Sequence, residues 1–103
     1  MAGRIRFTDD SGSKPRPAVV LSGDQYHRSR SDAVLVALSS NPKGSYFGDC
    51  ELTDWRVAGL LAPTKAKGLI ETVKRTAVKQ RLGSLSSNDF DRVKDSVRMI
   101  LEL

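Results

Sequence analysis

Residues 14–22 read KPRPAVVLS, a stretch in which a constrained loop passes directly into an apolar run. The run Ala18–Ser22 is rich in β-branched side chains and predicts a buried strand. Proline fixes its own φ at about −65° and restricts the residue before it, so Arg16, between Pro15 and Pro17, has little backbone freedom. Its permanently charged, forked guanidinium is held in a set direction where a strand begins, which favours binding a phosphate.

The rest of the N-terminal half alternates between apolar runs and breakers. Arg4–Asp10 predicts a short edge strand, and Gly23–Asp32 is polar and predicts a loop. Ala33–Leu38 is continuously apolar and predicts a strand covered on both faces. It ends at the breaker cluster Ser39–Gly44, after which Tyr46–Leu52 predicts a third strand.

The C-terminal half contains one ambiguous segment and one clear helix. Gly68–Arg81 carries both helical spacing and β-branched residues, so helix and strand both stay open. Cap residues at Ser86–Asp89 precede apolar side chains at helical spacing from Phe90 to Leu101, which predicts an amphipathic helix. Short strands with one packing helix predict a mainly β, small barrel-like fold in a single domain over residues 1–103.

Composition limits the cellular setting and the class of partner. The chain has 17 Lys and Arg against 12 Asp and Glu, and its net charge of +5 favours polyanionic partners. Cys50 is the only cysteine, so an intrachain disulfide is excluded and the cytoplasm is favoured. No sequence pattern predicts a secretory signal, a membrane span, a metal site or a cofactor site, so we expect neither a membrane location nor a cofactor.

An ordered series of short motifs resembles the MazF/PemK family of bacterial toxins. The motifs run from Phe7-Thr8-Asp9 and Ser11-Gly12-Ser13-Lys14 through Arg16–Ser22, Val34–Ser40, Gly59-Leu60 and Pro63-Thr64 to Leu82-Gly83-Ser84-Leu85. The resemblance covers nearly the whole chain. It implies an SH3-like barrel with a C-terminal helix, a homodimer and a cognate antitoxin, with contact to DNA only through that antitoxin. It also implies metal-independent cleavage of single-stranded mRNA at short sequences.

The same resemblance assigns catalytic roles to Arg16 and Ser39. In metal-free cleavage the 2′-hydroxyl attacks its own phosphate, and the extra negative charge on that phosphate needs fixed donors. Arg16 would stabilise this charge, and Ser39 would donate a hydroxyl hydrogen bond and position the phosphate. Many family members carry a glutamate where this chain has Lys14, so the general base stays unassigned. Many also carry a threonine where this chain has Ser39, a change that keeps the hydroxyl.

Four further residues are predicted to contact RNA in the same groove: Lys14, His27, Ser40 and Lys67. Each catalytic or RNA-contacting residue also has a purely structural interpretation. Arg16 could pair with Asp9, Asp10 or Asp24, Ser39 could bond its own backbone, and a lone histidine in a polar loop is more often structural than catalytic.

Two further alternatives stay open at the level of the sequence. Tyr46 and Trp55 could stack on bases, or they could belong to the core or to a contact between two copies of the chain. As an alternative function, a non-catalytic toxin of this fold would bind a protein target such as a topoisomerase.

Overall fold

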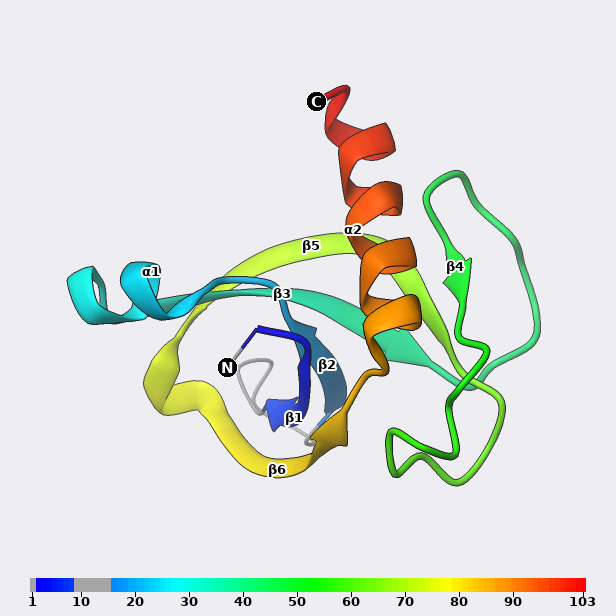
Figure 1. The fold of residues 1–103 in the computed structure, drawn as a ribbon, viewed down its shortest axis with the longest axis horizontal. Coiled ribbons are helices and arrows are strands. Elements are labelled where there is room, and N and C mark those ends of the chain that lie inside the picture. Colours follow the sequence, from blue (N-terminus) through cyan, green and yellow to red (C-terminus); the bar gives the residue numbers. More distant parts are fainter. Residues whose placement is uncertain (1, 9–15) are drawn as a thin grey trace.

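The computed structural model describes residues 2–8 and 16–103 as one antiparallel sheet with a long helix packed on it (Figure 1). The six strands lie in the order β4-β5-β3-β2-β1-β6. They are β1 (Arg4–Thr8), β2 (Arg16–Val20), β3 (Asp32–Ser39), β4 (Cys50–Glu51), β5 (Lys65–Lys74) and β6 (Val78–Ser84). The helices are α1 (Asp24–Ser29) and α2 (Ser87–Leu101), and a 3-10 turn, η1 (Arg75–Ala77), joins β5 to β6. This confirms the predicted mainly β class and the C-terminal helix.

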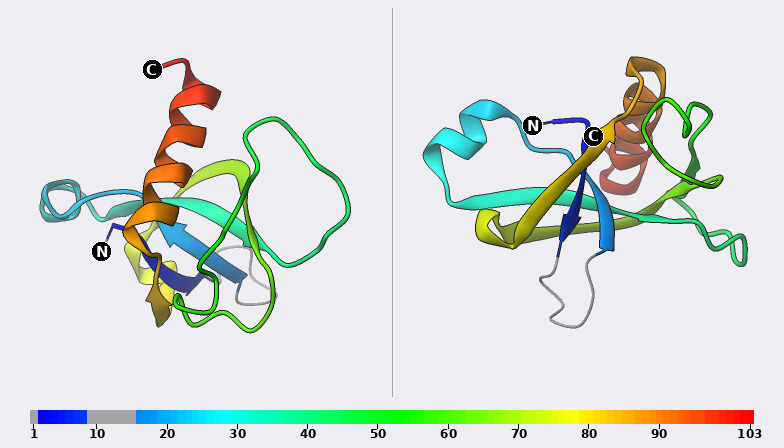
Figure 2. Two further views of the ribbon diagram at one scale, coloured as in Figure 1. Left: turned by 45° about the vertical axis from the view of Figure 1, so that its right-hand side comes forward. Right: turned by 90° about the horizontal axis from the view of Figure 1, so that it is seen from below.

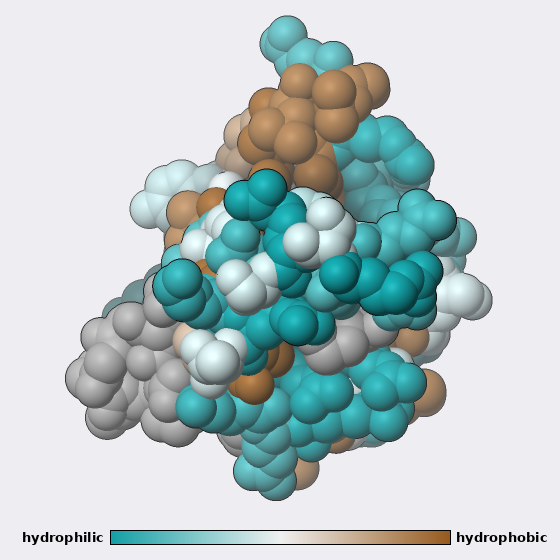
Figure 3. All heavy atoms as spheres, turned by 90° about the vertical axis from the view of Figure 1, so that its left-hand side faces the viewer, coloured by the Kyte–Doolittle hydropathy of each residue, from teal (hydrophilic) through white to brown (hydrophobic). Residues whose placement is uncertain are grey.

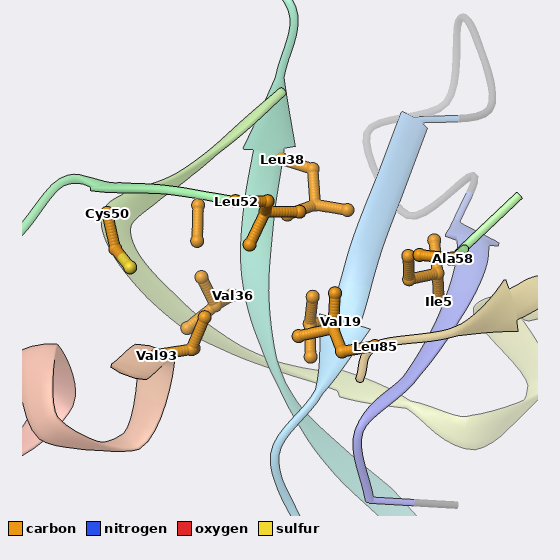
Figure 4. Close-up of a cluster of buried hydrophobic side chains, with 10 residues drawn as sticks. Ile5, Val19, Val36, Leu38, Cys50, Leu52, Ala58, Leu85 and Val93 are labelled. Atoms are coloured by element: carbon orange, nitrogen blue, oxygen red, sulfur yellow. The ribbon is translucent and has the colours of Figure 1, made fainter. Parts of the chain in front are cut away.

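The sheet is bent and not closed, because β4 and β6 form its two edges (Figure 2). Its main core lies between the sheet, α2 and the segment around Leu52 and Ala58. In this core Val36 of β3 lies near Val93 of α2, and Ile5 of β1 lies beside Ala58 (Figure 4). A smaller cluster on the other face contains Ala18, Val20, Ala33, Leu35 and Val73. Strand β3 contributes to both clusters, which confirms that its two faces are covered.

Two predictions about the N-terminal half were wrong. Strand β1 is not an edge strand, because it pairs with β2 on one side and with β6 on the other. The ambiguous segment supplies that second partner, since it forms most of β5 and the start of β6. The segment predicted as a polar loop contains α1, whose buried His27 anchors it to the end of the sheet.

The predicted third strand, Tyr46–Leu52, is only two residues long, Cys50–Glu51. Its first part is diverted by Asp49, whose carboxylate accepts the N–H groups of Tyr46 at 3.2 Å and Gly68 at 3.0 Å. A side chain therefore satisfies backbone donors that a strand ladder would otherwise use. Cys50 itself is buried.

A buried carboxylate joins the start of α2 to the core. The hydroxyl of Ser86 caps the helix by accepting the N–H of Asp89 at 3.1 Å. Asp89, fully buried, accepts the N–H groups of Thr53 at 2.9 Å and Asp54 at 2.7 Å and the Thr53 hydroxyl at 2.9 Å. The helix and the loop beneath it are thus fixed to one another by a single side chain.

Gly83 lets the 58–59 loop approach β6, and replacing it tests that contact. A Cβ at Gly83 would overlap the carbonyl oxygen of Ala58, a backbone atom that cannot move away by rotating a side chain. We expect Gly83→Ala to lower the free energy of unfolding by about 2–3 kcal/mol in urea denaturation. Gly23→Ala is the matched control, since nothing lies within 4 Å of its added Cβ, and it should cost less than about 1 kcal/mol. Equal losses in the two variants would contradict the close approach.

Candidate functional site

The antiparallel register brings Arg16 and Ser39 to the same end of the sheet. Ala18 on β2 pairs with Ala37 on β3, and Arg16 and Ser39 each lie two residues beyond that pair. Since Val19 and Leu38 point into the main core, alternation directs Arg16 and Ser39 to the opposite face. Arg16 is exposed at the first residue of β2, and Asp24 lies beyond the other end of that strand, in α1. A guanidinium and a hydroxyl are therefore presented on one face at one end of the sheet.

Ser39 lies at the edge of an open pocket of about 360 Å³. Ser40, Asn41, Thr64 and Lys65 also line it. A second pocket, of about 270 Å³, contains Pro17, the residue after Arg16, and shares Ser40 and Thr64 with the first. The two pockets therefore adjoin one another at Ser40 and Thr64.

The local structure after β3 fixes the Ser39 hydroxyl. Its oxygen accepts the N–H of Asn41 at 3.1 Å, and the Asn41 side chain in turn accepts the N–H of Lys43 at 3.0 Å. These two bonds satisfy a backbone turn and leave the hydroxyl hydrogen of Ser39 available to a ligand. The bonding to its own backbone that the sequence suggested is therefore present, and it is compatible with a role in binding. Ser40 is exposed beside it.

Two lysines of β5, Lys65 and Lys67, lie on the same face of the sheet as Ser39. Lys65 pairs directly with Ser39 across the sheet, and Ala66 points into the core, so Lys65 and Lys67 point away from it. Lys65 is nearly buried and is held by the Gly44 carbonyl at 2.7 Å and by Asp49 at 3.4 Å. Lys67 lines a separate pocket of about 240 Å³ beside the 40–49 loop. The sequence did not identify Lys65 as a site residue, because no spacing relates residue 39 to residue 65.

The electrostatics of the loop depend on Asp49. Burial raises the pKa of Asp49. The hydrogen bonds from the N–H groups of Gly68 and Tyr46 and the ammonium of Lys65 lower it by more, so the pKa of Asp49 lies below its ordinary value. The carboxylate is therefore ionised at neutral pH, and its charge is paired with that of Lys65.

His27 lies at the other end of β3 from Ser39, because α1 precedes the first residue of that strand (Figure 1). Its Nε2 is 2.6 Å from the Ser22 hydroxyl, which also accepts the N–H of Val34 at 2.9 Å. Burial lowers the pKa of His27, and the charge of Arg75 acts in the same direction. A neutral His27 therefore joins α1 to the sheet, and the structure does not bring it together with Arg16 and Ser39. Lys14 lies outside the described residues.

Among residues 2–8 and 16–103, no group of three or more His, Cys, Asp or Glu side chains is arranged to hold a metal ion. Across the same residues, no helix is long and apolar enough to span a membrane.

Solved structures share this arrangement of strands and helix. A mycobacterial endoribonuclease in complex with its cognate antitoxin matches with a TM-score of 0.83 at 17% identity, over 100% of this chain and 95% of that one. The Mycobacterium tuberculosis toxin MazF-mt6 matches with a TM-score of 0.80 at 14% identity, over 97% of each chain. A MazE-MazF structure from Deinococcus radiodurans gives 0.78 at 18%, over 99% and 94%.

The family assignment comes from the sequence. No curated protein matches the chain. A family model described as PemK-like, MazF-like toxin of type II toxin-antitoxin system, however, matches residues 4–101. That match extends from the start of β1 to the end of α2 and includes Arg16, Ser39 and Lys65. The chain therefore belongs to the PemK-like, MazF-like toxins of type II toxin-antitoxin systems.

Proposed function

We propose that this toxin is an endoribonuclease that cleaves single-stranded mRNA at short sequences without a metal ion. The observation that carries the proposal is the placement of an exposed arginine and a hydroxyl on one face at one end of the sheet. Ser39 lines one of two adjoining pockets at this end of the sheet, and Pro17, the residue next to Arg16, lines the other. Family membership and the endoribonucleases among the similar structures support the same activity.

In the proposed reaction the 2′-hydroxyl of one nucleotide attacks the adjacent phosphorus. The hydroxyl loses its proton, the bond from phosphorus to the 5′-oxygen breaks, and that oxygen takes up a proton. The products are a 2′,3′-cyclic phosphate and a free 5′-hydroxyl. Arg16 stabilises the charge that builds up on the phosphate oxygens, and Ser39 donates a hydrogen bond that positions the phosphate. No general base is assigned among the described residues.

The products test the proposal directly. Purified protein is incubated with a single-stranded transcript in EDTA, and the fragments are labelled with polynucleotide kinase with and without prior phosphatase treatment. We expect labelling without phosphatase, because the new ends carry 5′-hydroxyls. Growth arrest on expression, with RNA left intact, would instead favour the non-catalytic toxin that binds a protein such as a topoisomerase.

We also propose a homodimer, a cognate antitoxin as partner and a cytoplasmic location. Near the end of α2, Met99 and Leu101 are about half exposed, and Leu103 beyond the helix is largely exposed. Brown atoms gather in the upper part of Figure 3, below the teal atoms at its top. Exposed apolar side chains grouped on one helix end are typical of a contact between proteins. The charge of +5 favours an antitoxin with an acidic segment. Sedimentation of the purified toxin, with and without the protein encoded by the neighbouring gene, measures both associations.

A further inference from the structure

The 40–49 loop presents two neighbouring aromatic rings to solvent. Tyr46 is 72% exposed and Phe47 is 74% exposed. Both line the pocket of about 240 Å³ whose floor is formed by Lys67, Gly68 and Leu69 of β5. Two adjacent aromatic side chains gain little for the fold when they are this exposed, so a contact outside the chain is the simplest reason for their position.

Polar contacts fix the 40–49 loop to β5. Lys65 binds the Gly44 carbonyl, and Asp49 binds both the Lys65 ammonium and the Gly68 N–H. Gly68 permits the approach, because a Cβ there would lie 3.0 Å from the Phe47 carbonyl oxygen. The Tyr46 ring packs against the backbone of Gly44, where a Cβ would meet the ring at 3.2 Å. The rings are therefore presented in a prepared arrangement.

The charge around the rings favours a polyanion. Within residues 40–49 the charged side chains are Lys43, which is exposed, and Asp49, whose charge is paired with Lys65. Lys67 of β5 adds a second cation, because it lines the same pocket as the two rings. An apolar protein partner would need no such excess of positive charge, whereas a single-stranded nucleic acid offers a base for the rings and a phosphate for the lysine.

The loop also begins at the proposed catalytic end of the sheet. Ser39 is the last residue of β3, and Ser40 and Asn41 line the pocket that contains it. Lys65 contacts the loop at Gly44 while pairing with Ser39 across the sheet. Lys65 therefore links the loop that carries the aromatic rings to Ser39 at the end of β3.

We propose that Tyr46, Phe47 and Lys67 form a nucleobase subsite that binds an unpaired base of the RNA a short distance from the cleaved phosphate. This inference rests on the proposed ribonuclease activity and adds a base-binding site to it. Base stacking on an aromatic ring tolerates any base, so the subsite would contribute affinity and the requirement for a single strand. Lys67 would contact the backbone phosphate of the bound nucleotide.

The test is a double-mutant cycle with an oligonucleotide that cannot be cleaved. A single-stranded RNA 2′-O-methylated throughout is titrated with wild type, with Tyr46→Ala/Phe47→Ala and with the control Val57→Ala, an exposed apolar position outside the loop. We expect the double variant to bind about 5- to 100-fold more weakly and the control to be unchanged. Removing one base at a time from the oligonucleotide should weaken wild type at one position and leave the double variant unaffected there.

A second probe reports stacking itself. A 2-aminopurine at the sensitive position should lose fluorescence on binding wild type and keep it on binding the double variant. Equal affinities for all three proteins, in a toxin that still cleaves RNA, would overturn the subsite and leave the proposed function standing. Unchanged RNA affinity with a weakened self-association or antitoxin complex would show a protein-binding surface and overturn it equally. If wild type neither bound nor cleaved RNA, the proposed function itself would fail.

Discussion

Replacing Arg16 by alanine should reduce RNA cleavage by about 10²- to 10³-fold, with the folded structure intact. The side chain is exposed at the end of β2, so its loss removes no core contact. What is lost is a fixed charge opposite the phosphate, which is most valuable when negative charge builds up during attack. Arg16→Lys should recover only part of the rate, because an ammonium keeps the charge but lacks the planar pair of donors. Single-turnover rates on a short RNA substrate measure both variants.

Arg28→Ala is the matched control for that experiment. Arg28 is also an exposed arginine, but it lies in α1 at the opposite end of the sheet from Ser39. Its removal changes the net charge as much as the loss of Arg16 does, and we expect the rate to change by less than about threefold. Similar losses in the two variants would show that Arg16 acts only through overall charge.

Removing the buried carboxylate of Asp89 should produce the largest loss of stability. In Asp89→Ala the donors of Thr53 and Asp54 lose a charged acceptor, and each such bond is worth roughly 1.5–3 kcal/mol. After the carboxylate's own desolvation is subtracted, we expect a loss of about 4 kcal/mol in urea denaturation. Asp89→Asn keeps the volume and one acceptor oxygen, and it should lose about half as much. Asp91→Ala is the control, because Asp91 is exposed on the same helix.

The same network predicts how stability depends on pH. Burial raises the pKa of Asp89. The hydrogen bonds from Thr53 and Asp54 lower it by more than burial raises it, so the folded-state pKa lies below the ordinary value of 3.8. The stabilisation is therefore complete above the unfolded-state pKa and is lost as the pH falls through the folded-state pKa. Between pH 6 and pH 3 the free energy of unfolding should fall more steeply in wild type than in Asp89→Asn. Parallel curves would contradict the role of this carboxylate.

The sequence predicted the elements whose pattern is local. The apolar runs of β2 and β3 and the capped, amphipathic α2 were correct because periodicity and capping act over a few residues. Pairing over long distances was not predictable. Strand β1 became an inner strand only because β6 docks beside it, and β6 came from a segment that the sequence left undecided.

The site shows the same division. Pattern and resemblance predicted Arg16 and Ser39 as site residues. Their position at one end of the sheet follows from the β2–β3 register, which no single-sequence pattern specifies. His27 was grouped with them on chemical type alone, and the structure places it in α1, bonded to Ser22. The role of Lys65 depends on its pairing with Ser39 and on the folding of the 40–49 loop over β5. Both are long-range contacts that propensity does not reveal.

In the reaction we propose, Arg16 and Ser39 assist attack by a 2′-hydroxyl on the adjacent phosphate. The most direct measurement uses two short single-stranded substrates, identical except that one lacks the 2′-hydroxyl at the cleaved linkage. In EDTA the wild-type toxin should cleave the RNA linkage and leave the deoxy linkage intact while binding both. Cleavage of the deoxy linkage at a comparable rate would mean that water is the nucleophile, and it would contradict the account.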